Sequence, residues 1–295
     1  MVVVMAFWAA NFIVVKAANE QIPPVTFAFL RFGLAAVTLL AILQWREGRL
    51  GLPRRDIVPI LGLGALGFGI YQILWSVALQ DIPAGDSALL IATTPVITAL
   101  LAVVSRADTL TRTKLLGSLV SFSGVAIIVS AGHGISLGGA LVGDALTLLA
   151  AVCWSIYTAF GAPIMRRHSP LKTTAWAMVG GALVLLVPGA FQAVGVEWGG
   201  VGGDAWAGLL FSAFVPAGIA NVVVFSAIRL LGPTRITAYQ FLVPFMAVLM
   251  GAAFLAEPVR LDQLLGGLVI VIGVAIARTD RVTAFGGWLR ERLPA

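Results

Sequence analysis

The chain has 295 residues, of which 60% are apolar and only 11% are charged, and its mean hydropathy is +1.01. A soluble globular domain is roughly 45–50% apolar and about 25% charged, so the composition excludes an ordinary soluble protein. The net charge of +6 does not indicate nucleic-acid binding, because the basic residues lie in short segments between apolar runs. The single cysteine, Cys153, excludes an intramolecular disulfide and a multi-cysteine metal site.

Ten apolar segments follow one another along the chain, each near the roughly 20 residues with which a helix crosses a bilayer. Backbone polar groups find no water in lipid, so these segments are predicted to be helices. They cover residues 2–19, 25–45, 57–79, 84–104, 113–131, 143–165, 173–194, 205–231, 233–255 and 262–278. The predicted fold is an all-α, multi-pass protein of the cytoplasmic (inner) membrane.

The connections between these spans differ in charge from one side to the other. The segments after spans 2, 4, 6 and 8, together with the C-terminal tail, hold most of the 19 basic residues. The opposite connections carry Arg260 and several acidic residues. Because cytoplasmic loops are enriched in lysine and arginine, both termini are predicted to lie in the cytoplasm.

The sequence repeats itself at a constant offset. Residues 115–127 and 264–276 are identical at nine of 13 positions with an offset of 149, which also pairs Pro95 with Pro244 and Asp108 with Glu257. The predicted units are residues 1–131, a first repeat of five spans, and 143–278, a second. Five is odd, so the second repeat is predicted to be inverted in the membrane, which suits alternating access by a transporter.

A cytoplasmic tail is predicted at residues 279–295. This tail is predicted to be either a short helix on the membrane surface or a frayed end.

Several short motifs resemble a known family. They are the WAANFIVVK of residues 8–16, the Leu30-Arg31-Phe32 of span 2, the two paired prolines and the Leu-Leu-Gly that opens spans 5 and 10. Together they resemble the EamA-type branch of the drug/metabolite transporter superfamily over essentially the whole chain. The resemblance implies ten helices in two inverted repeats, a central cavity and export of amino acids or other small metabolites. Drugs, nucleosides and sugar derivatives are alternative substrates.

Polar and aromatic side chains within spans tend to face protein or a water-filled path. Repeat-equivalent spans 1 and 6, 3 and 8, and 4 and 9 contain such residues. Their amides and hydroxyls are predicted to bind a substrate's amino and carboxylate groups, and their rings to flank its side chain; interhelical hydrogen bonds or an interfacial belt are the alternatives. The predicted substrate-binding residues are Trp8, Asn11, Tyr71, Gln72, Trp75, Thr94, Trp154, Tyr157, Asn221, Tyr239 and Gln240.

Two prolines and two basic residues inside spans have further predicted roles. Pro95 and Pro244 each remove a helix hydrogen bond, and they are predicted to be either hinges or static kinks. Lys16 and Arg31 are candidate contacts for an anionic substrate group. Reaching out to the headgroups, or a pair between Lys16 and Glu20, is the preferred interpretation.

No aspartate or glutamate lies in the middle of a predicted span. Proton-coupled carriers commonly use embedded carboxylates, so a facilitative carrier is predicted, with a proton-coupled antiporter as the alternative. No Walker-type motif indicates ATP drive. The expected partners are a small-molecule substrate and the lipid bilayer, with no cofactor, metal or nucleic acid. The chain is expected to be a monomer, or a homodimer through spans 5 and 10.

Two motifs of enzymes occur without the context that their chemistry needs. Residues 62–67 match G-x-G-x-x-G, but they lie inside a span with no preceding strand. Residues 134–138 match the G-x-S-x-G of serine hydrolases, but Ser136 falls in a predicted outer loop rather than on a strained elbow. The chain is therefore not predicted to be an enzyme. A membrane-embedded binding or structural protein without transport is the remaining alternative.

Overall fold

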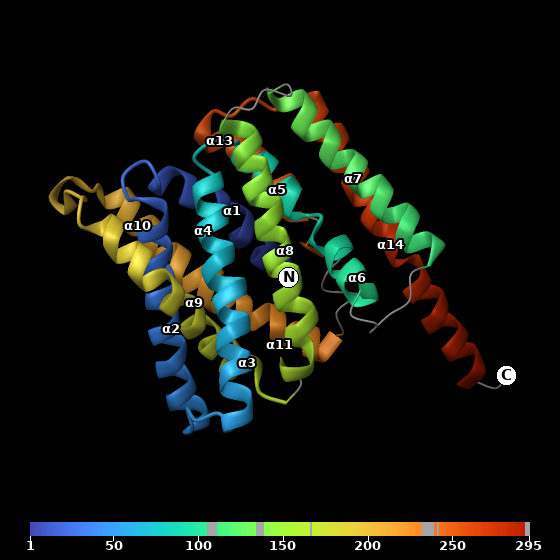
Figure 1. Cartoon of the computed structure of the whole chain (residues 1–295), viewed down its shortest axis with the longest axis horizontal. Helices are drawn as coiled ribbons and strands as arrows, with labels where there is room; N and C mark the ends of the chain where they lie inside the picture. Colours follow the sequence, from blue (N-terminus) through green and yellow to red (C-terminus); the bar gives the residue numbers. More distant parts are fainter. Residues whose placement is uncertain (105–110, 134–138, 166, 232–238, 241, 293–295) are drawn as a thin grey trace.

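In the computed structural model, residues 1–104, 111–133, 139–165, 167–231, 239–240 and 242–292 are described, and within them the chain forms helices and no strand. Figure 1 shows the helices gathered in one bundle, with α7 and α14 along one edge. In chain order they are α1 (Val2–Ala18), α2 (Pro24–Glu47), α3 (Arg54–Gly64), η1 (Ala65–Ile70), α4 (Tyr71–Ala78), α5 (Ala84–Ile91), α6 (Thr94–Val104), α7 (Arg112–His133), α8 (Gly139–Met165), α9 (Pro170–Ala193), η2 (Trp198–Gly200), α10 (Gly203–Ser212), η3 (Ala213–Ala220), α11 (Asn221–Leu231), α13 (Leu242–Leu255) and α14 (Leu261–Arg292).

Within these described ranges, seven helical segments are long and apolar enough to cross a membrane. They cover residues 24–47, 54–78, 84–101, 112–129, 140–161, 170–193 and 203–227. Three shorter apolar helices, Val2–Ala18, Leu242–Leu255 and Leu261–Ala277, lie where the sequence predicts spans 1, 9 and 10. The all-helical prediction is therefore confirmed for the described residues.

Two helix boundaries differ from the predicted ones. Span 10 was expected to end at residue 278, whereas α14 continues without a break to Arg292. Span 4 was expected to be one helix, whereas α5 ends at Ile91 and α6 begins at Thr94. The reason for the break is Pro95, which has no N–H to donate to the carbonyl four residues before it. The hydroxyl of Thr94 donates to that carbonyl, on Ile91, at 2.6 Å.

Spans 3 and 8 each contain a π-helical segment that the sequence analysis did not predict. η1 (Ala65–Ile70) separates α3 from α4, and η3 (Ala213–Ala220) separates α10 from α11. Shifting η1 by the repeat offset of 149 places it at residues 214–219, inside η3. Pro216 lies within η3 and cannot donate a backbone hydrogen bond. π-Helical turns are rare and frequent at functional sites.

The repeated segments of spans 5 and 10 pack against each other as α7 and α14. Gly117 faces Gly273, and Gly124 faces Gly266. A Cβ added at any of the four would lie 2.5–2.8 Å from the partner's carbonyl oxygen, so only glycine permits this approach. These glycines therefore set the close packing of α7 on α14 within the chain.

Helices of the two halves also interleave elsewhere. α2 packs against α9, α1 against α13, and α6 against α8. The hydroxyl of Thr26 in α2 donates to the carbonyl of Gly189 in α9 at 2.8 Å. A side chain on Gly189 would meet Phe29, so the small residue sets the distance between these helices. The halves therefore form one body around shared contacts.

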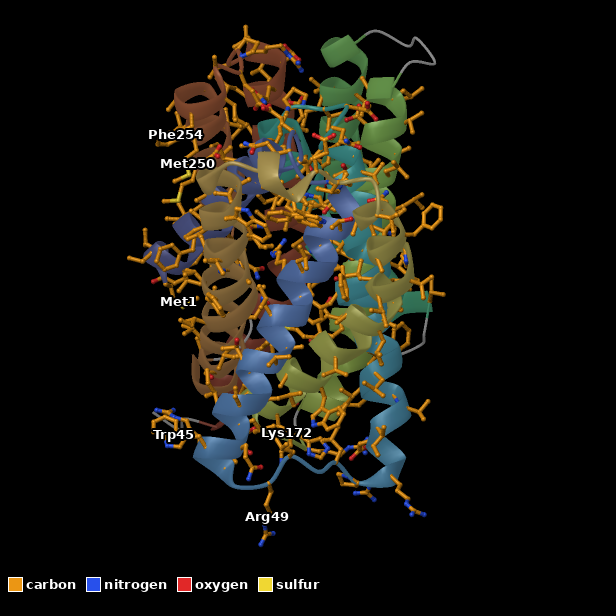
Figure 2. All side chains as sticks on the ribbon, turned by 90° about the vertical axis from the view of Figure 1, so that its left-hand side faces the viewer. Met1, Trp45, Arg49, Lys172, Met250 and Phe254 are labelled. Carbon is orange, nitrogen blue, oxygen red and sulfur yellow. The ribbon has the colours of Figure 1, made fainter. Side chains whose placement is uncertain are left out.

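The bundle has two ends of different character. Figure 2 shows Arg49 and Lys172 at one end, and Met250 and Phe254 toward the other. The first is called the basic end here, and the second, where α13 leads to Glu257, the opposite end.

Some predicted features lie outside the described residues. These are the G-x-S-x-G motif at residues 134–138, Asp108 of the repeat pairing, and residues 233–238 and 241 at the start of predicted span 9.

Candidate substrate-binding site

A polar cluster lies where α2 meets the start of α4 and the junction of α10 with η3. Arg31 is only 5% exposed. Its Nε donates to the carbonyl oxygen of Ser212 at 3.3 Å, and its Nη1 donates to Oε1 of Gln72 at 3.4 Å. The Ser212 hydroxyl donates in turn to Oδ1 of Asn11 at 2.5 Å. Of the predicted binding residues, Gln72 therefore contacts the buried arginine directly, and Asn11 is linked to it through Ser212.

An aromatic cluster joins the two halves of the chain beside this polar cluster. The ring centroids of Tyr71 and Trp154 are 5.6 Å apart, and those of Trp154 and Tyr157 are 5.2 Å apart. Trp75 stacks on Tyr71 at 6.3 Å, and its Nε1 donates to the buried hydroxyl of Ser87 at 3.1 Å. Four of the predicted binding residues are thus brought together by α4 and α8.

The hydroxyl of Tyr157 is buried and has no hydrogen-bond partner among the described residues. Burying a hydroxyl without a hydrogen-bond partner costs free energy. The Tyr157 hydroxyl is therefore available to hydrogen-bond a ligand. A small pocket of about 10 Å³, enough for a single water molecule, adjoins Tyr157 on the side of the basic end. The pocket is lined by Ile60, Leu63, Tyr157, Gly161, Ile164, Thr173 and Ala177.

Trp8 and Asn221 hold the π-helical segment η3 rather than each other. The indole Nε1 of Trp8 donates to the carbonyl of Pro216 at 3.3 Å. The amide of Asn221 donates to the carbonyls of Pro216 and Ala217, each at 3.0 Å. Both side chains therefore donate hydrogen bonds to backbone carbonyl groups of the π-helical segment η3.

The remaining predicted residues lie apart from the two clusters or serve the backbone. The Thr94 hydroxyl donates to the carbonyl of Ile91 at the helix break before Pro95. Tyr239 is 40% exposed and Gln240 is half-buried. Pro244 is buried in the first turn of α13.

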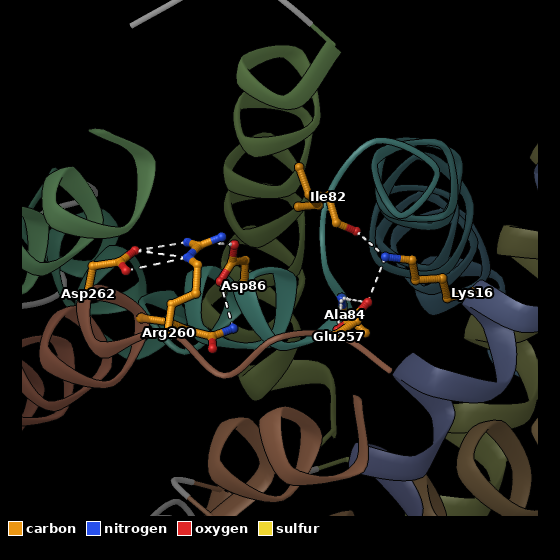
Figure 3. A network of polar contacts seen from close by, with 8 residues as sticks. Lys16, Ile82, Ala84, Asp86, Glu257, Arg260 and Asp262 are labelled. Carbon is orange, nitrogen blue, oxygen red and sulfur yellow. Dashed lines mark hydrogen bonds and ion pairs between the residues drawn. The ribbon is translucent and has the colours of Figure 1, made fainter. Parts of the chain in front are cut away.

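Lys16 forms an ion pair at the opposite end of the bundle, and its partner is not the expected Glu20. Its Nζ lies 2.7 Å from Oε1 of Glu257 and donates to the carbonyl of Ile82 at 2.8 Å. Both carboxylate oxygens of Glu257 accept from the backbone N–H of Ala84, at 3.0 and 3.1 Å. Figure 3 shows this network, which ties α1 and the start of α5 to the segment after α13.

A second ion-pair group lies beside the first. Arg260 donates to Asp262 at 2.9 Å and to Asp86 at 3.3 Å. Asp86 is buried and also accepts from the amide of Gln263 at 2.8 Å (Figure 3). Asp86 belongs to the first half and Arg260 to the second, so this group also crosses between the halves.

The basic end has its own contacts between the halves. Asp56 at the start of α3 accepts from Arg167 and from His168, each at 2.9 Å. Glu47 at the end of α2 accepts from the Ser169 hydroxyl at 2.5 Å, close to Lys172. Ionic contacts therefore join the halves at both ends.

Two further residues were not predicted: Ser212 of the polar cluster, and Phe68, whose ring centroid lies 5.7 Å from that of Trp154 and 5.1 Å from that of Tyr157. Ser212 was one of many hydroxyls in apolar runs, and a single Phe among 16 gives no signal. The repeat pairs Glu257 with Asp108, so the sequence singled out Glu257. Its ion pair with Lys16, 241 residues away, could not be predicted from the sequence.

The described helices, seven of which are long and apolar enough to cross a membrane, define a multi-pass α-helical membrane protein. The chain belongs to the EamA-like transporter family, whose model matches residues 1–130 and 141–279. These two stretches are close to the predicted repeat units. Transport of a small molecule across the cytoplasmic membrane follows from that membership.

Relatives are similar over nearly their whole length. The chain is 28% identical to the uncharacterized transporter YyaM of Bacillus subtilis over 92% of this chain and 90% of that protein. It is 29% identical to the probable terminal-alkyne amino-acid exporter of Streptantibioticus cattleyicolor, covering 94% and 91%. It is 28% identical to the probable amino-acid metabolite efflux pump of Salmonella typhimurium, covering 95% and 96%.

A solved crystal structure shares the fold. Its chain superimposes with a TM-score of 0.65 over 93% of this chain and 94% of its own, at 18% sequence identity. At that identity the likeness concerns the fold alone.

Proposed function

We propose that this transporter exports amino acids or similar small metabolites by alternating access, without a coupling ion. The observation that carries this proposal is the meeting of Tyr71 and Trp75 from the first half with Trp154 and Tyr157 from the second. A site built from both halves changes its exposure when the halves move relative to each other. The names of two relatives, an amino-acid exporter and an amino-acid metabolite efflux pump, support this substrate class.

Ten crossings in two inverted five-helix repeats, with both termini in the cytoplasm, complete the proposed architecture. Seven segments of spanning length and three shorter apolar helices support the count. The glycine contacts support the symmetry. The repeat equivalent of Gly117 is Gly266, and that of Gly273 is Gly124. Gly117 contacts Gly273, and the equivalent pair, Gly266 and Gly124, is also in contact. A pair of contacts that maps onto itself in this way is what a two-fold axis between the halves requires.

The two ionic networks are the proposed closures of the transport path. Lys16 and Glu257 join the halves at the opposite end, and Asp56 and Arg167 join them at the basic end. Export requires the basic end to open for loading and the opposite end to open for release. Each network is a set of contacts that must break and re-form in the cycle.

A proton-coupled antiporter is the second candidate, and one observation favours it. Asp86 and Asp144 are 2% and 3% exposed, and both lie at the opposite end near Arg260. Buried carboxylates of this kind are the usual carriers of protons in transporters.

Flux in proteoliposomes tests these alternatives. Purified protein is reconstituted, and uptake of a panel of labelled amino acids is measured with and without a pH gradient. Uptake that needs no gradient and is lost in Trp154→Ala is the expected result. Trp45→Ala is the matched control, because Trp45 is 81% exposed at the basic end. Uptake that depends on the gradient would replace facilitation by proton coupling, and an absence of any amino-acid flux would reject the substrate class.

A further inference from the structure

We propose that Arg31 binds the carboxylate of the transported solute, so that the site selects amino acids over amines of the same shape. This inference rests on the proposed function and names the chemical group that the site recognises. The residue proposed to bind the carboxylate is a buried arginine, which the sequence analysis left either at the headgroups or at an anionic group of the substrate.

The charge of Arg31 is buried without an acidic partner. The side chain is 5% exposed, and no carboxylate of the described residues lies within ion-pair distance of it. The guanidinium carbon lies 4.7 Å from the centroid of the Phe32 ring, and this cation–π contact offsets only part of the cost of burying a cation without a counter-ion. An anionic group arriving with the substrate removes that penalty.

The present contacts of Arg31 leave bonding capacity unused. Its two hydrogen bonds, to the carbonyl of Ser212 and to Oε1 of Gln72, are long at 3.3 and 3.4 Å, and both acceptors are neutral. No acceptor of the described residues bonds the third nitrogen, Nη2. Guanidinium groups bind carboxylates through two parallel N–H donors at shorter distances, so a carboxylate is the better acceptor here.

The position of Arg31 connects both halves of the transporter. Ser212 is the residue directly before η3, and Gln72 is the second residue after η1. A carboxylate that draws the guanidinium away from either acceptor therefore acts on both π-helical segments. Since these segments interrupt regular helix in spans 3 and 8, they are suitable places for a change of shape.

The neighbouring aromatic cluster supplies the remaining recognition. Tyr71 precedes Gln72 in the chain, and its ring contacts Trp75 and Trp154. Aromatic faces attract an ammonium group and pack against apolar side chains. The combination of one buried guanidinium and several rings fits a zwitterionic amino acid with an apolar side chain, and it disfavours cations that lack a carboxylate.

Binding in detergent solution separates this inference from transport itself. Tryptophan fluorescence is titrated with L-leucine, and with its amide and its decarboxylated amine as probes without a carboxylate. The same titrations are made on Arg31→Gln, Arg31→Lys and Arg49→Gln, where Arg49 is an exposed arginine at the basic end. Proteoliposome flux of L-leucine is measured in parallel, and circular dichroism confirms that each variant is folded.

The wild type and Arg49→Gln are expected to bind L-leucine and to bind neither analogue well. Arg31→Gln is expected to lose affinity for L-leucine by roughly ten- to a hundredfold, in line with the strength of charge-assisted hydrogen bonds. Arg31→Lys is expected to recover part of that affinity, because it keeps the charge without the planar fork.

The outcomes distinguish a failure of the proposed role of Arg31 from a failure of the proposed transport function. Flux and binding that persist in Arg31→Gln overturn the role of Arg31 and leave the proposed function standing. Binding that depends on Arg31 without flux supports the carboxylate site and rejects transport of amino acids. A wild type that binds the amide or amine as well as L-leucine overturns the selectivity, and an absence of both binding and flux rejects both proposals.

Discussion

Gly117 of α7 packs directly on Gly273 of α14, at a distance that leaves no room for a Cβ on either residue. The contact joins the last helix of each half. Gly117→Ala is expected to force the two helices apart and to lower stability by about 1–3 kcal/mol, the usual cost of overpacking. Thermal unfolding in detergent, followed by circular dichroism, measures the effect.

Gly62→Ala is the matched control for that prediction. Gly62 also lies in a helix, but an added Cβ there meets no atom within 4 Å. Because alanine favours the helix by about 1 kcal/mol over glycine, this variant is expected to hold or raise the melting temperature. Equal losses in both variants would mean that glycine has no special part in the α7–α14 contact.

The pair formed by Lys16 and Glu257 is expected to stabilise the closure of the opposite end. Lys16→Met and Glu257→Gln should each lower the melting temperature, and their combination should cost less than the sum, with a coupling of about 0.5–3 kcal/mol. Thermal unfolding of the two single variants and the double variant gives this coupling. Strict additivity would show that the 2.7 Å contact contributes nothing.

The contact of Arg167 with Asp56 is expected to hold the basic end closed. Arg167→Gln should increase amide hydrogen exchange at the starts of α3 and α9, because the buried Asp56 carboxylate loses a donor at 2.9 Å. Hydrogen exchange read by mass spectrometry measures it. Arg55→Gln is the control, since Arg55 lies 3.9 Å from the same carboxylate and is 76% exposed. A similar rise in both variants would contradict a specific role for Arg167.

The break before Pro95 is expected to act as a hinge. In Pro95→Ala the new N–H can donate to the carbonyl of Ile91 and continue the helix from α5 into α6. Amino-acid flux is then expected to fall several-fold while binding in detergent is retained. Pro188→Ala is the control, because Pro188 lies within α9 where the helix is unbroken. Unchanged flux in Pro95→Ala would make the break a static kink.

The unpartnered hydroxyl of Tyr157 has two opposite consequences. Tyr157→Phe is expected to raise stability, by up to about 1–3 kcal/mol, because a buried unsatisfied group is removed. The same change is expected to weaken amino-acid binding if the hydroxyl meets the substrate. Melting temperature and fluorescence titration are measured on one sample, with Phe191→Leu as control, because Phe191 is 82% exposed. A lower melting temperature would reveal a partner for the hydroxyl, and unchanged affinity would place it outside the site.

Much of the fold could be predicted from the sequence because lipid imposes a length and a composition on every crossing. Every predicted apolar segment overlaps helix within the described residues, although α14 extends past the predicted end of span 10 and span 4 is broken before Pro95. The π-helical segments were not predictable, because Gly67 and Pro216 occur in apolar runs that would serve an ordinary helix equally well.

For the site, the sequence by itself determined which side chains are too polar or too aromatic to be left in lipid. Their partners were decided by the tertiary structure alone, since Arg31 and Ser212 are 181 residues apart and Lys16 and Glu257 are 241 apart. The sequence left Arg31 either at the headgroups or at the substrate. Burial beneath α4 and α10 decided against the headgroups, because a side chain enclosed by neighbouring helices has no path to the membrane surface.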